Sequence, residues 1–293
     1  MAEKQAVQAP KNVPLFADLP MRVGYDETRR FLWGDEQSGE VNDIIYGRGQ
    51  SISCLIFTLA PGRNFRSSER WKAMFDQNRF YYVLEGELTI QDPETGDVAV
   101  ARPGEAIFWR GAKWHFGFNF GATETVVLDW YAPQERPPDV PEIVFGETKP
   151  VLGEVANARQ DLLGKWPAAL PGERDRRLRD GAVVTLTEND ALHVLQGQAS
   201  QVRESLYVST DQLTAGSLTL PASFRGDVVV HEGGDKVILC EKGRVNVHLP
   251  VSFDWYELGE KDCLYLPRGT PHQFWNYTGE AARAMFYVVP DYA

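Results

Sequence analysis

Short apolar or alternating runs recur along most of the chain, separated by Gly, Pro and Asp residues. Alternation of apolar and polar residues with a period of two is typical of strands that bury one face. Runs of this kind stand at 51–60, 79–90, 124–132, 216–222, 227–232, 236–249 and 284–290. Many short strands with turns between them predict an all-β protein, built as an antiparallel sandwich or barrel.

Four landmarks of the first half return in the second half at a constant spacing of 157 residues. They are Gly86 and Gly243, His115 and His272, Asn119 and Asn276, and Pro133 and Pro290. The pairs Phe108 and Tyr265, and Arg79 and Lys236, keep the same offset. We interpret this register as a duplicated domain, because chance rarely aligns so many landmarks over such a span.

The segment between the halves, residues 133–181, interrupts the strand pattern. It opens with a proline-rich stretch and closes with a charged one, which we interpret as a solvated surface. Between them, Glu154–Trp166 has a helix-like pattern. The segment is therefore predicted to be a linker with a short helix.

Composition narrows the classes of function. The formal net charge of −11 argues against nucleic acid or an anionic membrane as a partner, because phosphate groups are bound by basic surfaces. Cys54, Cys240 and Cys263 each stand in an apolar run, which predicts buried, reduced thiols and fits the cytoplasm. No signal peptide and no apolar run of about 18 residues or more is found, so we expect no membrane span.

The stretch PRGTPHQFWN, Pro267–Asn276, has the form of a tight turn that leads into a strand. Because side chains alternate along a strand, His272, Phe274 and Asn276 are predicted to share one face. The stretch resembles the second sequence motif of the cupin superfamily, P-x-G-x(2)-H-x(3)-N, and KVILCEKGRV resembles the end of the first motif. In the N-terminal half the second motif is degraded to FWRGAKWHFGFN.

The paired arrangement resembles a bicupin, which implies two jelly-roll β-barrels in tandem. We expect an N-terminal barrel within 1–148, with its core at 50–135. We expect the linker and the C-terminal barrel within 149–293, with the core at 205–290. The resemblance also implies a homodimer.

Cupin enzymes typically hold one metal ion with a His-x-His pair, a glutamate and a later histidine. Carried over by position, the resemblance implies His231 and His272 as ligands in the C-terminal half, with Val229 and Lys236 at the other two positions. The N-terminal half keeps only His115. Lys72, Met74 and Arg79 stand at its other ligand positions. A cation at the glutamate position repels a divalent ion, so no metal is expected in the N-terminal barrel.

The C-terminal barrel is the candidate for one divalent metal ion, Fe, Mn, Ni or Zn. Two histidines and a carboxylate form a face that suits such ions. Glu232 and Asp235 are the nearby carboxylates. Glu232 follows His231 directly and points the opposite way in a regular strand, whereas a Gly-Gly pair allows Asp235 to fold back. We therefore predict His231, His272 and Asp235 as the metal ligands.

A small-molecule ligand is predicted to bind near Tyr265, Phe274 and Asn276. Three functions of the protein remain open. The first is a metal-dependent oxygenase or lyase in the C-terminal barrel. The second is a metal-independent isomerase, lyase or cyclase in which His272 and Lys236 carry protons, with His231 as the partner of His272. The third is a non-catalytic bicupin that binds or senses a small ligand, which the lost metal ligands favour.

Overall fold

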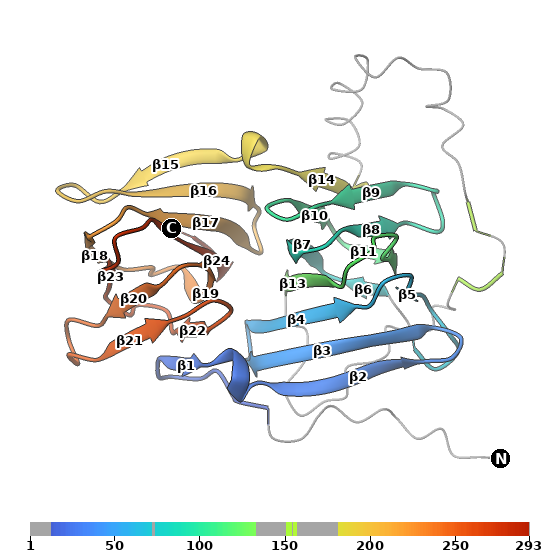
Figure 1. Ribbon diagram of the computed structural model, residues 1–293, viewed down its shortest axis with the longest axis horizontal. Coiled ribbons are helices and arrows are strands. Elements are labelled where there is room, and N and C mark those ends of the chain that lie inside the picture. The colour runs from blue at the N-terminus through green and yellow to red at the C-terminus, as the bar shows by residue number, and fades with distance from the viewer. Residues whose placement is uncertain (1–12, 72–73, 133–150, 154, 157–180, 293) are drawn as a thin grey trace.

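The computed structural model describes residues 13–71, 74–132, 151–153, 155–156 and 181–292. Within these ranges the regular structure is β-strand, apart from two short 3-10 turns, η1 (Tyr25–Glu27) and η3 (Glu188–Asp190). The strands form two antiparallel barrels side by side (Figure 1). The predicted all-β architecture with two tandem barrels is confirmed.

The first barrel pairs a large sheet with a small one. The large sheet has the order β14 (Val184–Leu186), β10 (Ala106–Trp109), β7 (Asn78–Glu85), β13 (Thr125–Ala132), β4 (Ser53–Leu59), β3 (Gly39–Arg48) and β2 (Arg29–Asp35). The small sheet has the order β5 (Asn64–Phe65), β12 (Phe116–Phe118), β8 (Leu88–Gln91) and β9 (Val98–Ala101). A separate pair is formed by β11 (Ala112–Trp114) and β6 (Met74–Asp76).

The second barrel repeats this plan. Its large sheet has the order β1 (Met21–Val23), β22 (Cys263–Leu266), β19 (Gly234–Lys242), β24 (Ala282–Pro290), β17 (Thr214–Leu220), β16 (Val202–Ser209) and β15 (Leu192–Gln196). Its small sheet has the order β18 (Phe224–Val229), β23 (His272–Asn276), β20 (Val245–His248) and β21 (Trp255–Leu258). Each large sheet therefore begins upstream of the core range expected from the sequence.

The two barrels exchange their edge strands. β1 precedes the first barrel in the chain but pairs with β22 of the second, with Met21 opposite Tyr265. β14 precedes the second barrel but pairs with β10 of the first, with Val184 opposite Phe108. Pairing of an edge strand satisfies backbone groups that would otherwise remain open. The exchange therefore ties the barrels together in a way that the sequence pattern does not reveal.

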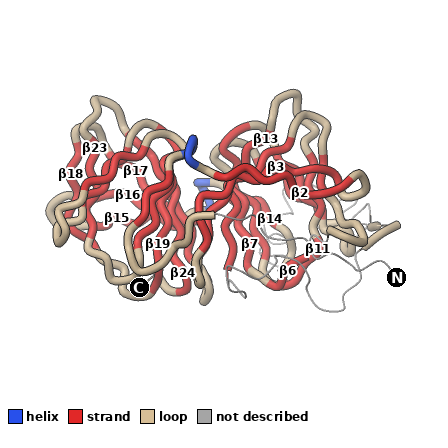
Figure 2. The backbone as a smooth tube through the Cα atoms, turned by 90° about the horizontal axis from the view of Figure 1, so that it is seen from below, coloured by secondary structure: helices blue, strands red, loops and turns tan. Residues whose placement is uncertain are grey.

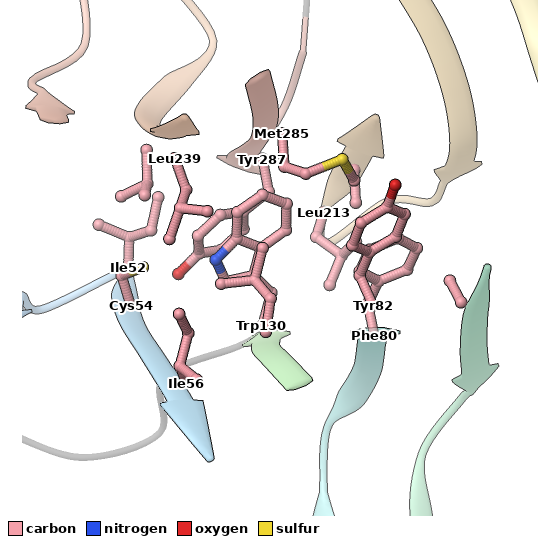
Figure 3. Close-up of a cluster of buried hydrophobic side chains, with 14 of the residues drawn as sticks. Ile52, Cys54, Ile56, Phe80, Tyr82, Trp130, Leu213, Leu239, Met285 and Tyr287 are labelled. Carbon is pink, nitrogen blue, oxygen red and sulfur yellow. The ribbon is translucent and has the colours of Figure 1, made fainter. Parts of the chain in front are cut away.

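The large sheets also pack against each other, with β19 and β24 of one barrel facing β7 of the other (Figure 2). A buried apolar cluster fills the space between them. At its centre the Trp130 and Tyr287 rings stack with centroids 4.5 Å apart (Figure 3). The Tyr82 hydroxyl donates a hydrogen bond to the Glu241 carboxylate across the same interface, at 2.8 Å. A buried aromatic core of this kind holds the two barrels in one arrangement.

The duplicated landmarks occupy equivalent places. Gly86 and Gly243 end the long strands β7 and β19 and have φ values of 75° and 77°, which a glycine adopts without strain. Asn119 and Asn276 are both buried, and their amide nitrogens donate to backbone carbonyl oxygens, two for Asn119 and three for Asn276. The repeat predicted from the 157-residue offset is therefore present in the fold.

Most of the predicted linker, residues 133–150, 154 and 157–180, lies outside the described residues. The helix expected over Glu154–Trp166 lies outside the described residues, except for 155 and 156, which belong to neither a helix nor a strand.

The three cysteines are buried and free, as predicted. The described part of the chain has no helix long and apolar enough to cross a membrane.

Candidate functional site

The turn at Pro267–Gly269 delivers His272 to the interior of the second barrel. Gly269 has a φ of 75°, which permits the tight turn before the strand. His272 begins β23 opposite Val229 of β18, and it is 1% exposed. Its Nδ1 lies 2.9 Å from the Thr270 carbonyl oxygen. This contact fixes the ring, with the proton on Nδ1 and the lone pair on Nε2.

Lys236 lies in the same interior and contacts the second histidine. It projects from β19, is 1% exposed, and places Nζ 2.8 Å from His231 Nε2. The His231 and His272 rings are 5.7 Å apart between centroids. The rings of Phe274 and Phe286 flank Nζ, with their centroids 5.3 and 4.8 Å away. The structure thus brings His231, Lys236 and His272 together, as the sequence predicts.

Both histidines present an acceptor nitrogen to the barrel interior. His231 Nδ1 lies 3.3 Å from the Tyr292 carbonyl oxygen, so its Nε2 lone pair accepts a hydrogen bond from Lys236. His272 Nε2 has no hydrogen-bond partner within the described residues. A buried acceptor left unpaired is costly, so such an atom is a place where a ligand is favoured.

Glu204 adds a carboxylate that the sequence reading did not single out. It lies on β16, is fully buried, and accepts a hydrogen bond from the Tyr292 hydroxyl through Oε2. Its Oε1 has no partner among the described residues. The sequence signal is a glutamate at a buried position of the alternating strand Val202–Ser209. Tyr292 also packs its ring 5.1 Å from that of His231 and is only half-buried.

The pKa values of Lys236, His231 and His272 are all lowered. Burial lowers the pKa of Lys236 to about 8, against the opposing effect of Glu204. Burial, followed by the nearby Lys236 charge, lowers the pKa of His231 to about 3. The same two causes hold the pKa of His272 well below its usual value. At neutral pH the site therefore combines two neutral imidazoles with one ammonium group that is close to its pKa.

Asp235 does not join the two histidines, so the predicted set of three metal ligands is not assembled. Its carboxylate accepts hydrogen bonds from Ser51 Oγ at 2.6 Å and from the Arg268 backbone N–H at 2.9 Å. The physical reason is the regular start of β19, where successive side chains alternate and Lys236 takes the inward position. Glu232 is exposed. In the described ranges, no three His, Cys, Asp or Glu side chains are grouped to hold a metal ion.

The three residues predicted to line a substrate pocket, Tyr265, Phe274 and Asn276, lie in different surroundings. Tyr265 belongs to the core between the barrels, where its ring stacks on Phe16 with centroids 4.7 Å apart. Asn276 uses its side chain to hold the turn that follows β23. Phe274 alone lies in the barrel interior, with its ring 5.3 Å from that of His272.

The first barrel has a different buried cation at the position equivalent to Lys236. Arg79 Nη1 lies 2.8 Å from Asp129 Oδ2, and both side chains are less than a tenth exposed. His115 Nε2 lies 3.2 Å from the Tyr81 hydroxyl. Met74 belongs to β6, and Lys72 lies outside the described residues. An arginine paired with an aspartate thus stands where the family's glutamate is expected.

A pocket opens beside this pair. Its cavity volume is about 60 Å³, and it opens to solvent. Its walls include the rings of Trp33, Phe57, Phe65, Tyr81 and His115, and its polar groups include Arg79 and Asp129. Aromatic walls with a few polar groups are typical of small-molecule sites. The sequence reading expected the pocket in the other barrel.

Acid should destabilise the protein through His115. Burial, with a further effect of Arg79, lowers the pKa of His115 to about 3, whereas an unfolded chain has the ordinary value near 6.5. Below pH 6.5 the unfolded chain binds the proton and the folded chain does not, so stability falls with pH until about pH 3. At pH 4.5 the loss from this group is about 2–3 kcal/mol.

Denaturant unfolding of the wild type and His115→Gln at pH 7 and pH 4.5 measures this effect. The variant should lose about 2–3 kcal/mol less than the wild type over that interval. An equal loss in both proteins would show that His115 does not carry the pH dependence.

Comparison with known proteins gives structural similarity only. No family profile and no curated protein matches the sequence. Solved structures do match in fold. The putative glyoxylate-induced protein of Pseudomonas aeruginosa is 15% identical, with a TM-score of 0.60 over 97% of this chain and 94% of that one. Oxalate decarboxylase of Lactobacillus farciminis, in a formate complex, is 12% identical, with a TM-score of 0.60 over 95% and 88%.

A third solved structure of similar fold is that of a manganese protein. Oxalate decarboxylase of Bacillus subtilis, described with Mn(II) centres, is 11% identical, with a TM-score of 0.60 over 97% of this chain and 80% of that one. These identities show the fold and not the chemistry. The fold is that of a bicupin, with two cupin barrels in one chain.

Proposed function

Taking the bicupin fold as the starting point, we propose that this protein is an enzyme that acts on a small organic molecule in the C-terminal barrel without a metal ion. The reaction is a proton transfer of the isomerase, lyase or cyclase kind. His272 acts as the proton acceptor and Lys236 as the proton donor, and His231 orients the Lys236 ammonium. Fold alone does not carry this assignment, because one fold hosts many chemistries.

The observation that carries the proposal is the contact between Lys236 Nζ and His231 Nε2 at 2.8 Å in a fully buried setting. Two groups with separated pKa values in one site supply a base and an acid at the same pH. Here the neutral His272 imidazole accepts a proton, and the Lys236 ammonium, with a pKa of about 8, donates one at neutral pH.

The residues present do not fit a divalent metal ion. The Lys236 ammonium uses the His231 lone pair that a metal would need, and it places a positive charge at the centre of the site. The carboxylate expected as the third ligand binds Ser51 and the Arg268 backbone instead. The donor set therefore disfavours the metal-dependent oxygenase or lyase that the family resemblance implies.

Solvent deuterium exchange tests the proposal. Pyruvate, acetaldehyde and cyclohexanone are incubated with the protein in D2O, and loss of their α-proton signals is followed by NMR. We expect catalysed exchange with at least one of them, lowered about 10²–10⁴-fold in His272→Ala. His193→Ala is the matched control, because His193 bonds Ser205 on the outer edge of the sheet. Exchange that is absent, or equal in the wild type and His272→Ala, would contradict the proposal.

A second candidate is non-catalytic binding of a small ligand, and the pocket beside Arg79 and Asp129 favours it. A binding protein would take up a ligand in the N-terminal barrel and catalyse no exchange. Ligand screening by thermal shift with Tyr81→Phe and His272→Ala separates the two functions, because only the first variant touches this pocket.

A further inference from the structure

Aromatic side chains gather on the outer face of the small sheet of the second barrel, on the side that faces away from the first barrel (Figure 1). Val247 on β20 and Phe274 on β23 belong to the buried core of this barrel. Side chains alternate along a strand, so the next residues, His248 and Trp275, point outward. Trp255, on the neighbouring strand β21, lies opposite His248. This outer face is separate from the candidate site inside the barrel.

The rings of Trp255, Trp275 and Tyr277 form one platform on this face. The Trp255 centroid lies 5.8 Å from that of Trp275 and 5.4 Å from that of Tyr277. The centroids of Trp275 and Tyr277 are 5.2 Å apart. Trp255 is 37% exposed and Tyr277 is 62% exposed. Exposed apolar patches that are rimmed by polar groups are typical of interaction sites.

Polar atoms beside the platform lack partners. Asn246 Oδ1 and His248 Nδ1 are buried, and neither has a hydrogen-bond partner within the described residues. Asn246 is 2% exposed and lies opposite Trp275 in the sheet. Its Oδ1 can only accept a hydrogen bond, so the missing partner is a donor such as a hydroxyl group. A buried acceptor without a donor costs free energy, which a ligand hydroxyl would recover.

Trp255 is the ring that can move aside to let a hydroxyl reach Asn246. Its indole N–H makes only a long contact with Glu257 Oε1, at 3.4 Å. Trp275 is held more firmly, because its indole N–H donates to Gln273 Oε1 at 3.0 Å. The platform therefore combines one fixed ring with one that can adjust to a ligand.

Charged groups at the rim restrict the ligand to a neutral molecule. The Arg225 guanidinium lies 4.5 Å from the Trp275 ring centroid and disfavours a second cation there. The exposed Glu257 carboxylate beside Trp255 disfavours an anion. We propose that this face binds a neutral carbohydrate. Its C–H face would stack on the rings, whose faces carry negative charge, and its hydroxyl groups would donate to Asn246 Oδ1. This binding function is independent of the reaction proposed inside the barrel.

The first barrel supplies a matched control. One repeat of 157 residues earlier, Phe118 and Phe120 stand in the places of the last two rings, with centroids 5.5 Å apart. Phe120 is 72% exposed. In place of Trp255 this barrel has Val98, and in place of the asparagine it has Thr89. The first barrel thus keeps two stacked rings without the third ring and without the open acceptor, so we expect no carbohydrate to bind there.

Saturation-transfer NMR tests the proposal. The full chain is titrated with maltotetraose, cellotetraose and triacetylchitotriose, and the affinity for each is measured. We expect at least one of them to bind in the millimolar range, with the strongest saturation on the C–H protons of one sugar face. Trp255→Ala and Tyr277→Ala should each weaken this binding about tenfold, and Asn246→Ala about threefold. Phe120→Ala should leave the affinity unchanged.

Several outcomes would overturn the proposal. They are the absence of binding to all three sugars at tens of millimolar, binding that survives in Trp255→Ala, and binding that is lost in Phe120→Ala. Self-association that Trp255→Ala abolishes, in a protein that binds none of the sugars, would assign the platform to a second copy of the chain instead. None of these results bears on proton transfer inside the barrel.

Discussion

Asp129→Leu is expected to lower the free energy of unfolding by about 3–5 kcal/mol, because it leaves the buried Arg79 charge without its carboxylate. Arg79 Nη1 lies 2.8 Å from Asp129 Oδ2 and both side chains are buried, with the Arg79 guanidinium 4.5 Å from the Tyr131 ring centroid. Water cannot replace the lost partner fully at such a site, so the cost of burying the charge is no longer offset.

Urea unfolding measures this change, and two variants control it. Arg79→Met/Asp129→Leu removes both charges and should recover most of the stability, because a buried ion pair is often replaced by apolar residues at little cost. Asp211→Asn breaks the exposed pair with Arg110 and should change stability by less than about 1 kcal/mol. If Asp129→Leu costs no more than Asp211→Asn, the pair does not stabilise the first barrel as argued.

Lys236→Glu is expected to create a metal site in the second barrel. The substitution removes the ammonium from His231 Nε2 and supplies a carboxylate beside His231 and His272. Two histidines and one carboxylate suit Fe(II) and Mn(II). The new carboxylate would bind the metal ion directly. It should therefore raise the affinity for the metal by more than the roughly 10–100-fold that residues hydrogen-bonded to a ligand contribute.

Calorimetric titration with Mn²⁺ measures the gain. The wild type should show no heat of binding under conditions in which Lys236→Glu binds one ion per chain. Lys236→Glu/His272→Ala should lose that binding again, whereas Lys236→Glu/His115→Ala should keep it, because His115 lies in the other barrel. Binding that survives the loss of His272 would place the metal elsewhere.

Much of the fold could be predicted because its signals are local or periodic. Gly86 and Gly243 mark turns that need a positive φ, and the alternation of apolar residues marks the strands around them. The exchange of β1 and β14 could not be predicted, because both are three-residue strands whose partners are far away in the chain. Short edge strands leave almost no periodic pattern to detect.

The site was predictable in part for the same reason. His272 and His231 were identified because they keep places in a sequence motif, and Lys236 because it stands where a ligand is missing. The prediction for Asp235 assumed a break in the strand, whereas β19 pairs regularly with β24 from Gly234 to Cys240 and turns Lys236 inward instead. Glu204 was missed because its significance comes from Tyr292 and Lys236, both distant in sequence.

Two expectations stay predictions. The homodimer follows from family resemblance, and sedimentation at micromolar concentration distinguishes it from a 33.0 kDa monomer. The cytoplasmic location is expected only from the three cysteines in apolar runs of the sequence.

Elemental analysis of the wild-type protein tests the central claim most directly. The protein is purified without chelators and without a metal-affinity resin, so that its native metal content is retained. If Lys236 takes the place of a metal ion between His231 and His272, each chain should carry far less than one equivalent of Fe, Mn, Ni or Zn. One equivalent of any of these ions, lost in His272→Ala and retained in His115→Ala, would contradict the account.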